Sequence, residues 1–222
     1  MFKDVYIKQI FPRLFHIEFP NQYIITSTFM RMQEFYESPY ENIKGNYFSL
    51  EEFMDTYAEH QGNFTYTTDW NGFNVPGNIV VEFFEVFGYR MLNKEIKFLN
   101  LLRDNIDKKF LTTNKKFYLI GSIVNNKGTM NHEIAHGLFY LNEDYRKEIL
   151  KLNAEKDLAE YKKDLLNMGY CEEVLDDEIQ AFFATSDEDK MKKIFETPDV
   201  DFNIQKPYKI LFQKTISECG IS

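Results

Sequence analysis

The sequence predicts an α+β fold in which an aromatic-rich N-terminal half of mixed structure precedes a helical C-terminal half. Two strand-like runs lie in the part of the chain that holds many of its 22 Phe and 14 Tyr residues. A third lies at 116–124, and the charged sequence after it has helical periodicity. With 222 residues, 44% of them hydrophobic, the chain can bury a full core. We therefore expect a single domain over 1–222, with an α+β lobe at 1–115 and a strand plus helical lobe at 116–222.

The strand-like runs of the N-terminal lobe are 23–28 and 64–68. Both have the β-branched and aromatic composition that favours strands, and a turn signal at 69–72 follows the second. The aromatic residues of this lobe could line a peptide cleft, but aromatic residues at this density more often form a core. We therefore expect them to be core residues.

Two helices are predicted in the same lobe from capping signals. Ser49 and Glu52 have the spacing of a capping box, which predicts a short helix through about Glu59. Asn93 can cap another helix that ends near Asp107.

The run at 116–124 is β-branched and aromatic, which predicts a strand. Asn125 and Gly128 then interrupt it, and Thr129 can cap a helix over 130–141. Because the second half of this helix has almost no polar face, we expect the helix to lie in the interior.

The rest of the C-terminal lobe has the pattern of charged amphipathic helices. Leu158, Tyr161, Leu165 and Met168 form one apolar stripe, and Gly169 follows as a stop signal. This helix should brace the helices around it.

The motif His132-Glu133-Ile134-Ala135-His136 carries the strongest chemical signal. A helix brings residues four apart onto one face, so two imidazoles can bind a single metal ion. Glu133 projects from the side of that face, where its carboxylate can reach a water molecule on the open position of the metal, as a zinc hydrolase requires. The other interpretation is a helix whose histidines only pack and whose glutamate is a solvated charge.

Glu178 is the best candidate for a third metal ligand. The segment 171–185 carries one apolar stripe, and Glu178 is the carboxylate in the middle of it. A buried charge requires a partner, and a metal ion is one. The alternatives are a salt bridge from Glu178 to a lysine or arginine, or a shallow stripe that leaves Glu178 exposed to water. Ala181 is small enough for close packing against the histidine helix. The neighbours assigned to the polar side are Glu172, Glu173, Asp176, Asp177 and Gln180.

These residues resemble the gluzincins, which are zinc peptidases with HExxH on one helix and a glutamate on a second helix. The resemblance covers His132 to His136 and, more loosely, Glu178 to Ala181 with Phe183 and Ala184. It implies a zincin-like domain and names no particular family. No matching signature occurs in residues 1–115.

Carried over to this chain, the resemblance implies that His132, His136 and Glu178 bind Zn²⁺ and that Glu133 is the general base. The implied activity is cleavage of peptide bonds by a zinc-activated water. The resemblance also suggests that a strand before the metal helix binds the peptide as an added strand.

The run at 116–124 is the candidate for that strand, and a central core strand is the equal alternative. Tyr140, Tyr208 and His60 are conceivable oxyanion donors, but no spacing rule selects among them, so this role stays unassigned.

We therefore predict a zinc metallopeptidase acting on a peptide or protein substrate. Two alternatives stay open: a catalytically silent metal-binding or interaction protein with a zincin-like fold, and a zinc hydrolase of non-peptide amides. Substrate specificity and oligomeric state cannot be predicted from this sequence.

Composition limits the other classes of function. The net charge of −9 argues against a nucleic-acid partner, which requires a basic face. Two cysteines are too few for a disulfide framework, and neither a signal peptide nor a membrane-spanning run is seen. The expected location is therefore cytoplasmic, without a membrane partner.

Overall fold

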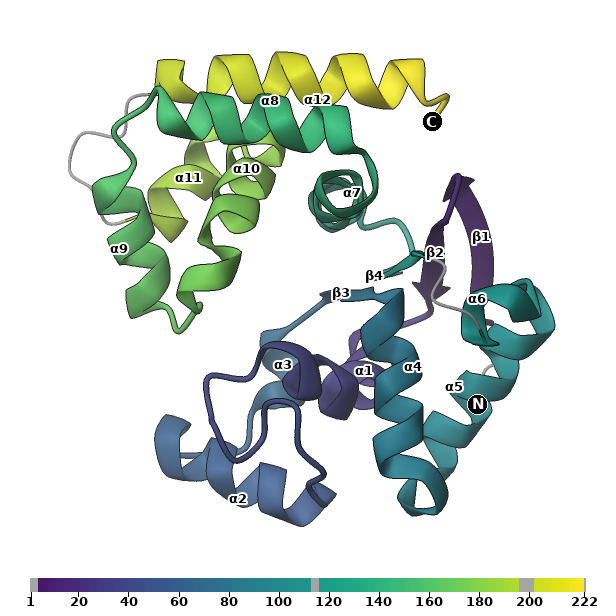
Figure 1. Cartoon of the computed structure of the whole chain (residues 1–222). Coiled ribbons are helices and arrows are strands. Elements are labelled where there is room, and N and C mark those ends of the chain that lie inside the picture. Colours follow the sequence, from purple (N-terminus) through teal and green to yellow (C-terminus); the bar gives the residue numbers. More distant parts are fainter. Residues whose placement is uncertain (1–3, 113–115, 196–201, 222) are drawn as a thin grey trace. The chain divides into compact units, whose positions relative to one another are not determined.

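The computed structural model describes residues 4–112, 116–195 and 202–221. The chain is α+β, as the sequence predicts, and it forms two compact units, 1–126 and 127–222 (Figure 1). The strand that was expected in the C-terminal lobe belongs to the N-terminal unit, because both of its hydrogen-bonded neighbours are strands of that unit. The boundary between the units therefore follows this strand instead of preceding it.

A four-stranded mixed sheet with the order β1-β2-β4-β3 organises the N-terminal unit. Its strands are β1 (Tyr6–Phe11), β2 (Leu14–Phe19), β3 (Gly72–Pro76) and β4 (Tyr118–Ile123). β1 and β2 form an antiparallel hairpin, β2 and β4 are parallel, and β3 is antiparallel to β4. β4 confirms the strand predicted at 116–124. Its central position agrees with the core-strand alternative and not with an edge strand that could bind a peptide.

Helices pack around this sheet, and aromatic side chains fill the space between them. The helices are α1 (Gln22–Glu37), α2 (Leu50–Gln61), α3 (Tyr66–Asp69), α4 (Gly77–Phe87), α5 (Asn93–Asn105) and α6 (Lys108–Thr112), with a 3-10 turn η1 at Gly88–Arg90. The ring of Phe29 on α1 lies 5.3 Å from that of Phe73 on β3 and 5.2 Å from that of Phe98 on α5. Many of the aromatic residues of this unit are therefore core residues, as expected, whereas Tyr6, Tyr23, Trp70 and Tyr89 are exposed.

The strand predictions at 23–28 and 64–68 are wrong. The first segment lies within α1, whose N-cap is Asn21, and the second ends in the short helix α3. In α1 the buried residues Ile25, Phe29 and Met32 recur at helical spacing, so packing of one helical face overrides the β-branched composition.

The structure confirms both predicted helices and the cap at Ser49, but Asn93 is the first residue of its helix and the N-cap is Leu92. Ser49 accepts a hydrogen bond from the backbone N–H of Glu52, whose side chain accepts one from Ser49, and α2 follows. α5 begins at Asn93, and Glu95 accepts a hydrogen bond from the backbone N–H of Leu92. Both helices are thus fixed at their first turn by a glutamate.

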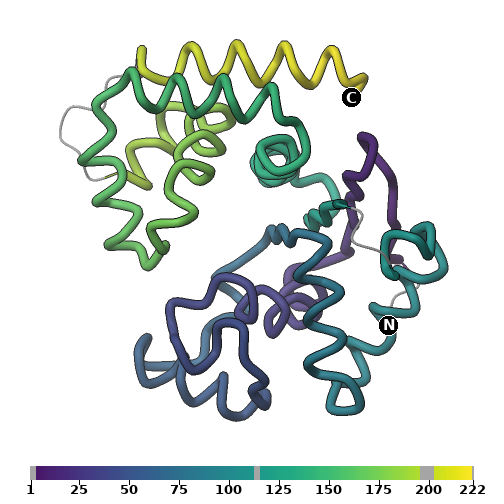
Figure 2. The backbone as a smooth tube through the Cα atoms, viewed as in Figure 1, coloured from purple at the N-terminus to yellow at the C-terminus, as the bar shows by residue number. Residues whose placement is uncertain are grey.

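Every regular element among the described residues of the C-terminal unit is a helix. Its elements are α7 (Lys127–Leu141), α8 (Glu143–Ala154), α9 (Ala159–Asn167), η2 (Glu172–Val174), α10 (Leu175–Thr185), α11 (Glu188–Ile194), η3 (Phe202–Gln205) and α12 (Lys206–Glu218). α10 packs on α7 and α12, and α8 runs beside α12 (Figure 2). α7 confirms the predicted helix, but it starts before Thr129, which is therefore not its cap.

The stripe predicted around α9 is largely buried. Leu158, Tyr161 and Leu165 are buried, whereas Met168 is half exposed. The ring of Tyr161 lies 5.1 Å from that of Phe183 on α10, so α9 braces the helix that carries Glu178. Gly169 has a φ of +98°, the left-handed conformation expected of a glycine that ends a helix.

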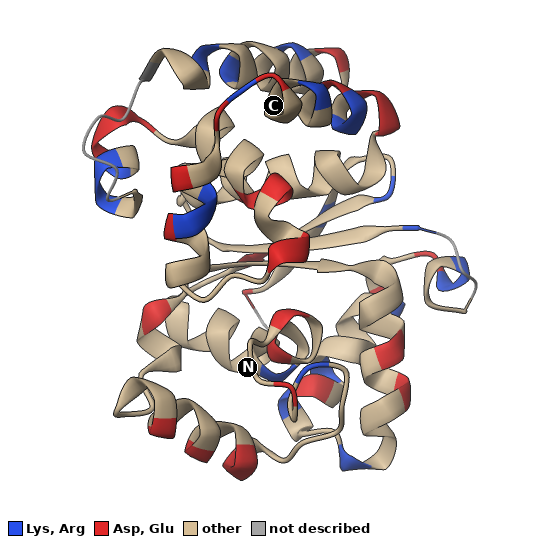
Figure 3. Cartoon of the chain, turned by 60° about the vertical axis from the view of Figure 1, so that its left-hand side comes forward, with Lys and Arg blue, Asp and Glu red and all other residues tan. Residues whose placement is uncertain are grey.

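Acidic and basic residues are spread over the helices of both units (Figure 3). Among the described residues, no helix combines the length and apolar composition needed to cross a membrane.

Candidate metal centre

α7 carries the HExxH motif in the interior of the C-terminal unit. Residues 133–138 of this helix are buried, and the side chain of His132 is 12% exposed. The rings of His132 and His136 lie one turn apart with centroids separated by 4.8 Å, and their Nε2 atoms are 3.3 Å apart. The two imidazoles therefore present the same nitrogen to one point, as the spacing in the sequence predicts.

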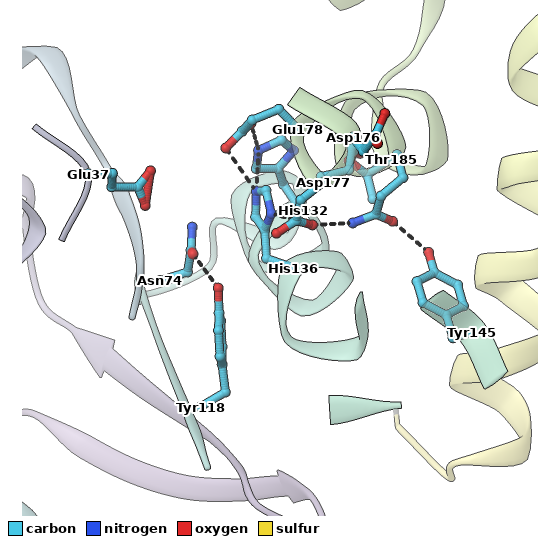
Figure 4. A network of polar contacts seen from close by, with 12 residues as sticks. Glu37, Asn74, Tyr118, His132, His136, Tyr145, Asp176, Asp177, Glu178 and Thr185 are labelled. Atoms are coloured by element: carbon cyan, nitrogen blue, oxygen red, sulfur yellow. Dashed lines mark hydrogen bonds and ion pairs between the residues drawn. The ribbon is translucent and has the colours of Figure 1, made fainter. Parts of the chain in front are cut away.

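α10 brings Glu178 to the same point (Figure 4). Its Oε2 lies 3.8 Å from Nε2 of His132, and its Oε1 lies 3.6 Å from Nε2 of His136. One ligand atom from each of the three residues lies within 4.8 Å of the other two. The structure thus brings together the three side chains that the sequence analysis selected as metal ligands.

Close packing of the two helices makes this approach possible. Ala181, one turn after Glu178, is fully buried, and α10 makes extensive contact with α7. The ring of Phe182 lies 4.6 Å from that of His132. The small side chain of Ala181 allows the backbones of α7 and α10 to come close, while the ring of Phe182 covers His132.

The first turn of α10 is fixed by polar contacts to other helices. Asp176 accepts a hydrogen bond from Asn153 of α8 at 3.2 Å and forms a 2.9 Å ion pair with Lys162 of α9. Tyr208 of α12 donates to Asn153 at 2.8 Å. These contacts hold the start of α10 against α8 and α9.

The prediction that Asp177 and Gln180 lie on the polar side of the helix is wrong, because both contact groups in the interior. Oδ1 of Asp177 lies 3.0 Å from Nδ1 of His136 and accepts a 2.9 Å hydrogen bond from Nε2 of Gln180. The hydroxyl of Tyr145 on α8 donates to Oε1 of Gln180 at 2.8 Å, and Gln180 is fully buried. Because α10 packs on several helices at once, its buried arc is wider than one apolar stripe.

Two polar atoms of the cluster lack a hydrogen bond. Among the described residues, neither Nδ1 of His132 nor Oε2 of Glu178 has a partner of normal geometry, although both are buried. The backbone carbonyl of Ala181 is near enough to favour the protonated form of His132 slightly. Buried polar atoms without partners are rare in proteins and call for an explanation.

The protonation of the cluster reflects its burial and its excess of carboxylates. Burial, followed by the charges of His136 and Lys190, lowers the pKa of His132 well below its ordinary value. Burial opposes protonation of His136 too, but Asp177, Glu178 and Glu133 together raise its pKa well above the ordinary value. Burial raises the pKa of Glu178 to about 7.

Glu133 is buried on α7, and its carboxylate raises the pKa of both His136 and Glu178.

The three candidates for an oxyanion donor lie in different places. Tyr140 is half-buried on α7, whereas the hydroxyl of Tyr208 is engaged by Asn153. His60 lies on α2 of the other unit, stacked on Tyr40. No contact selects one of them for this role.

Two imidazole nitrogens and one carboxylate oxygen match the donor set that zinc takes in catalytic sites, and the unpartnered oxygen of Glu178 lies within this set. The residues present therefore fit a zinc ion.

Comparison with known protein families, with curated proteins and with solved structures gives no match for this chain.

Proposed function

We propose that the chain is a zinc-dependent hydrolase with a zincin-like C-terminal site, and that its substrates are peptides or proteins. The observation that carries the proposal is the convergence of His132, His136 and Glu178, with Glu133 between the two histidines on the same helix. The resemblance of these residues to gluzincins supports a peptide as the substrate.

Each residue has a chemical task in this proposal. His132, His136 and Glu178 would hold the metal, and a zinc ion held by three protein ligands supplies Lewis acidity that activates water and polarises a carbonyl. The carboxylate of Glu133 accepts a proton from the attacking water and passes it to the departing amine. The burial of Glu133 strengthens these electrostatic effects because it limits screening by bulk water.

Metal content tests the first half of the proposal. Elemental analysis of protein purified without added metal should find about one zinc per chain. The substitutions His132→Ala, His136→Ala and Glu178→Ala should each remove most of it. His60→Ala is the matched control, since His60 is an exposed histidine outside the cluster and its loss should leave the zinc content unchanged. Wild-type protein that binds no zinc under any condition would contradict the metal centre.

Peptide cleavage tests the second half. A peptide-library digest with wild type and with Glu133→Gln should show cleavage by the wild type and a loss of about 10²–10⁴-fold in the variant, because the general base is removed. The variant should retain its zinc. Equal cleavage by both proteins would reject Glu133 as the base, and zinc without cleavage in the wild type would favour a silent metal-binding protein.

A further inference from the structure

The two histidines of the cluster are held differently. Nδ1 of His136 faces a carboxylate at 3.0 Å, whereas Nδ1 of His132 has no hydrogen-bond partner among the described residues. The carboxylate is that of Asp177, which precedes the candidate ligand Glu178 on α10. Asp177 itself is not one of the three residues whose ligand atoms lie within 4.8 Å of one another.

From Asp177 a line of hydrogen bonds continues across α10 to α8. Gln180 donates to Asp177 at 2.9 Å, and Tyr145 donates to Gln180 at 2.8 Å. Tyr145 lies in the first turn of α8, where its backbone N–H donates to the N-cap residue Asn142 at 3.1 Å. Tyr145 and Gln180 are both buried, so their part of the line is shielded from water and anchored at a helix terminus, whereas Asp177 is 23% exposed.

The chemistry of these groups fixes the direction of every hydrogen bond. An ionised carboxylate only accepts, so Gln180 must turn its NH₂ group towards Asp177. This leaves the carbonyl oxygen of Gln180 to accept from the hydroxyl of Tyr145. For the same reason His136 must donate to Asp177 from Nδ1–H. This leaves Nε2, which faces Glu178 at 3.6 Å, as the nitrogen that can bind a metal once it has given up its own proton.

We propose that Asp177 is a positioning residue for the metal centre, and that Gln180 and Tyr145 hold it in place. This inference rests on the proposed function, since it assigns a role in binding the metal. Asp177 keeps His136 in the tautomer and ring orientation that present Nε2 to zinc, as outer-shell carboxylates commonly do for metal-bound histidines. Among the described residues, Nδ1 of His132 has no such carboxylate partner.

Zinc affinity of the full chain, measured by competition with a chelator, tests this role. Asp177→Ala should weaken zinc binding about 10- to 100-fold, the usual effect of removing an outer-shell partner. Tyr145→Phe removes only the hydroxyl at the far end of the line and should weaken binding about fivefold or less. Replacement of zinc by Co²⁺ adds a spectroscopic signature, and Asp177→Ala should change the visible absorption bands of the bound cobalt.

Asp176→Ala is the matched control for loss of charge and for instability. It removes the adjacent carboxylate of the same helix, which contacts Asn153 and Lys162 instead of a histidine. It should lower the thermal stability while leaving the zinc affinity and the cobalt spectrum unchanged. Circular dichroism verifies folding, and if Asp177→Ala does not fold, Asp177→Asn and Tyr145→Phe carry the same comparison.

The failure of this inference differs from the failure of the proposed function. Wild-type protein without zinc would reject the metal centre itself. Wild-type protein that binds zinc, with folded Asp177 and Tyr145 variants that match it in affinity and in cobalt spectrum, would reject only the positioning role. Equal weakening by Asp176→Ala and Asp177→Ala would also reject it, because charge alone would then explain the effect.

Discussion

The N-terminal unit and the C-terminal unit both bury charged side chains, but they satisfy them to different extents. In the N-terminal unit, Arg31 and Glu95 are nearly inaccessible and form two hydrogen bonds of 2.8 and 2.6 Å. Arg31 also donates to the carbonyl of Phe48, and Glu95 accepts from the backbone N–H of Leu92. In the C-terminal unit, the cluster of His132, His136 and Glu178 leaves two buried polar atoms without a hydrogen bond.

This difference separates a structural ion pair from a candidate binding site. A buried pair whose donors and acceptors are all used has no capacity to bind anything else, and its value lies in the fold. A buried cluster with unused ligand atoms is unfavourable in itself, and such a cluster persists where it serves another purpose. The contrast gives opposite expectations for substitutions in the two places.

The largest effect on stability is expected at the buried ion pair of Arg31 and Glu95. Glu95→Ala leaves the guanidinium of Arg31 buried and unpaired, so the free energy of unfolding should fall by about 3–5 kcal/mol. Urea unfolding measures this change. Glu160→Ala is the control, because its ion pair with Lys163 is exposed and should contribute less than about 1 kcal/mol. Similar losses in both variants would remove the distinction between a closed buried pair and a surface pair.

A buried histidine of the N-terminal unit provides the second test. Nε2 of His16 on β2 lies 2.8 Å from the hydroxyl of Ser122 on β4. Burial, with a smaller contribution from the charge of Lys8, lowers the pKa of His16 from 6.5 to about 4. Unlike His136, this histidine has no carboxylate among its hydrogen-bond partners in the described part of the chain, so the fold favours its neutral form.

The sign of the pH effect follows from this shift. Between pH 6.5 and 4 the unfolded chain binds more protons than the folded chain, so stability is fully present above pH 6.5 and is lost as the pH falls through this window. At about 1.4 kcal/mol for each pKa unit, the loss should be about 3 kcal/mol. Urea unfolding at both ends of the window should show this loss in the wild type and a smaller one in His16→Gln. Identical pH dependence in the two proteins would mean that His16 does not titrate as described.

The candidate ligands could be predicted from the sequence because two strong local patterns carry them. The spacing of His132 and His136 fixes both on one helical face, and Glu178 stands in the middle of an apolar stripe. The line of hydrogen bonds through Asp177 could not be predicted in this way. Asp177 lies on α10 and Tyr145 lies on α8, and only the packing of these two helices joins them. The spacing of Asp177 and Gln180 is the one local signal for it, since residues three apart meet on a helix.

The hairpin of β1 and β2 could not be predicted for a different reason. The turn between β1 and β2 contains Pro12 and Arg13, and Arg13 adopts a φ of +73°. Tight hairpin turns with positive φ usually contain glycine or asparagine, and neither residue occurs here. The helix α1 was mistaken for a strand because its first turns are β-branched, and only its packing on the sheet reveals the helical period.

The smallest expected change in stability is an increase, and it lies in the cluster of His132, His136 and Glu178. Glu178→Gln replaces a buried carboxylate, whose Oε2 lacks a hydrogen bond, with a neutral amide of the same shape. Burial raises the pKa of Glu178 to about 7, so the folded state disfavours its charged form. The neutral amide should therefore raise the free energy of unfolding of the zinc-free protein by about 1 kcal/mol above this pH. Urea unfolding in the presence of a chelator measures this change.

Added zinc should reverse the order of the two proteins. At a free zinc concentration about 100 times the Kd, the wild type should gain about 2.7 kcal/mol through binding, whereas Glu178→Gln should gain much less because it has lost a ligand. If Glu178→Gln instead destabilised the zinc-free protein as strongly as Glu95→Ala, the cluster would be a second closed structural network. Its unpartnered atoms would then no longer support a metal centre.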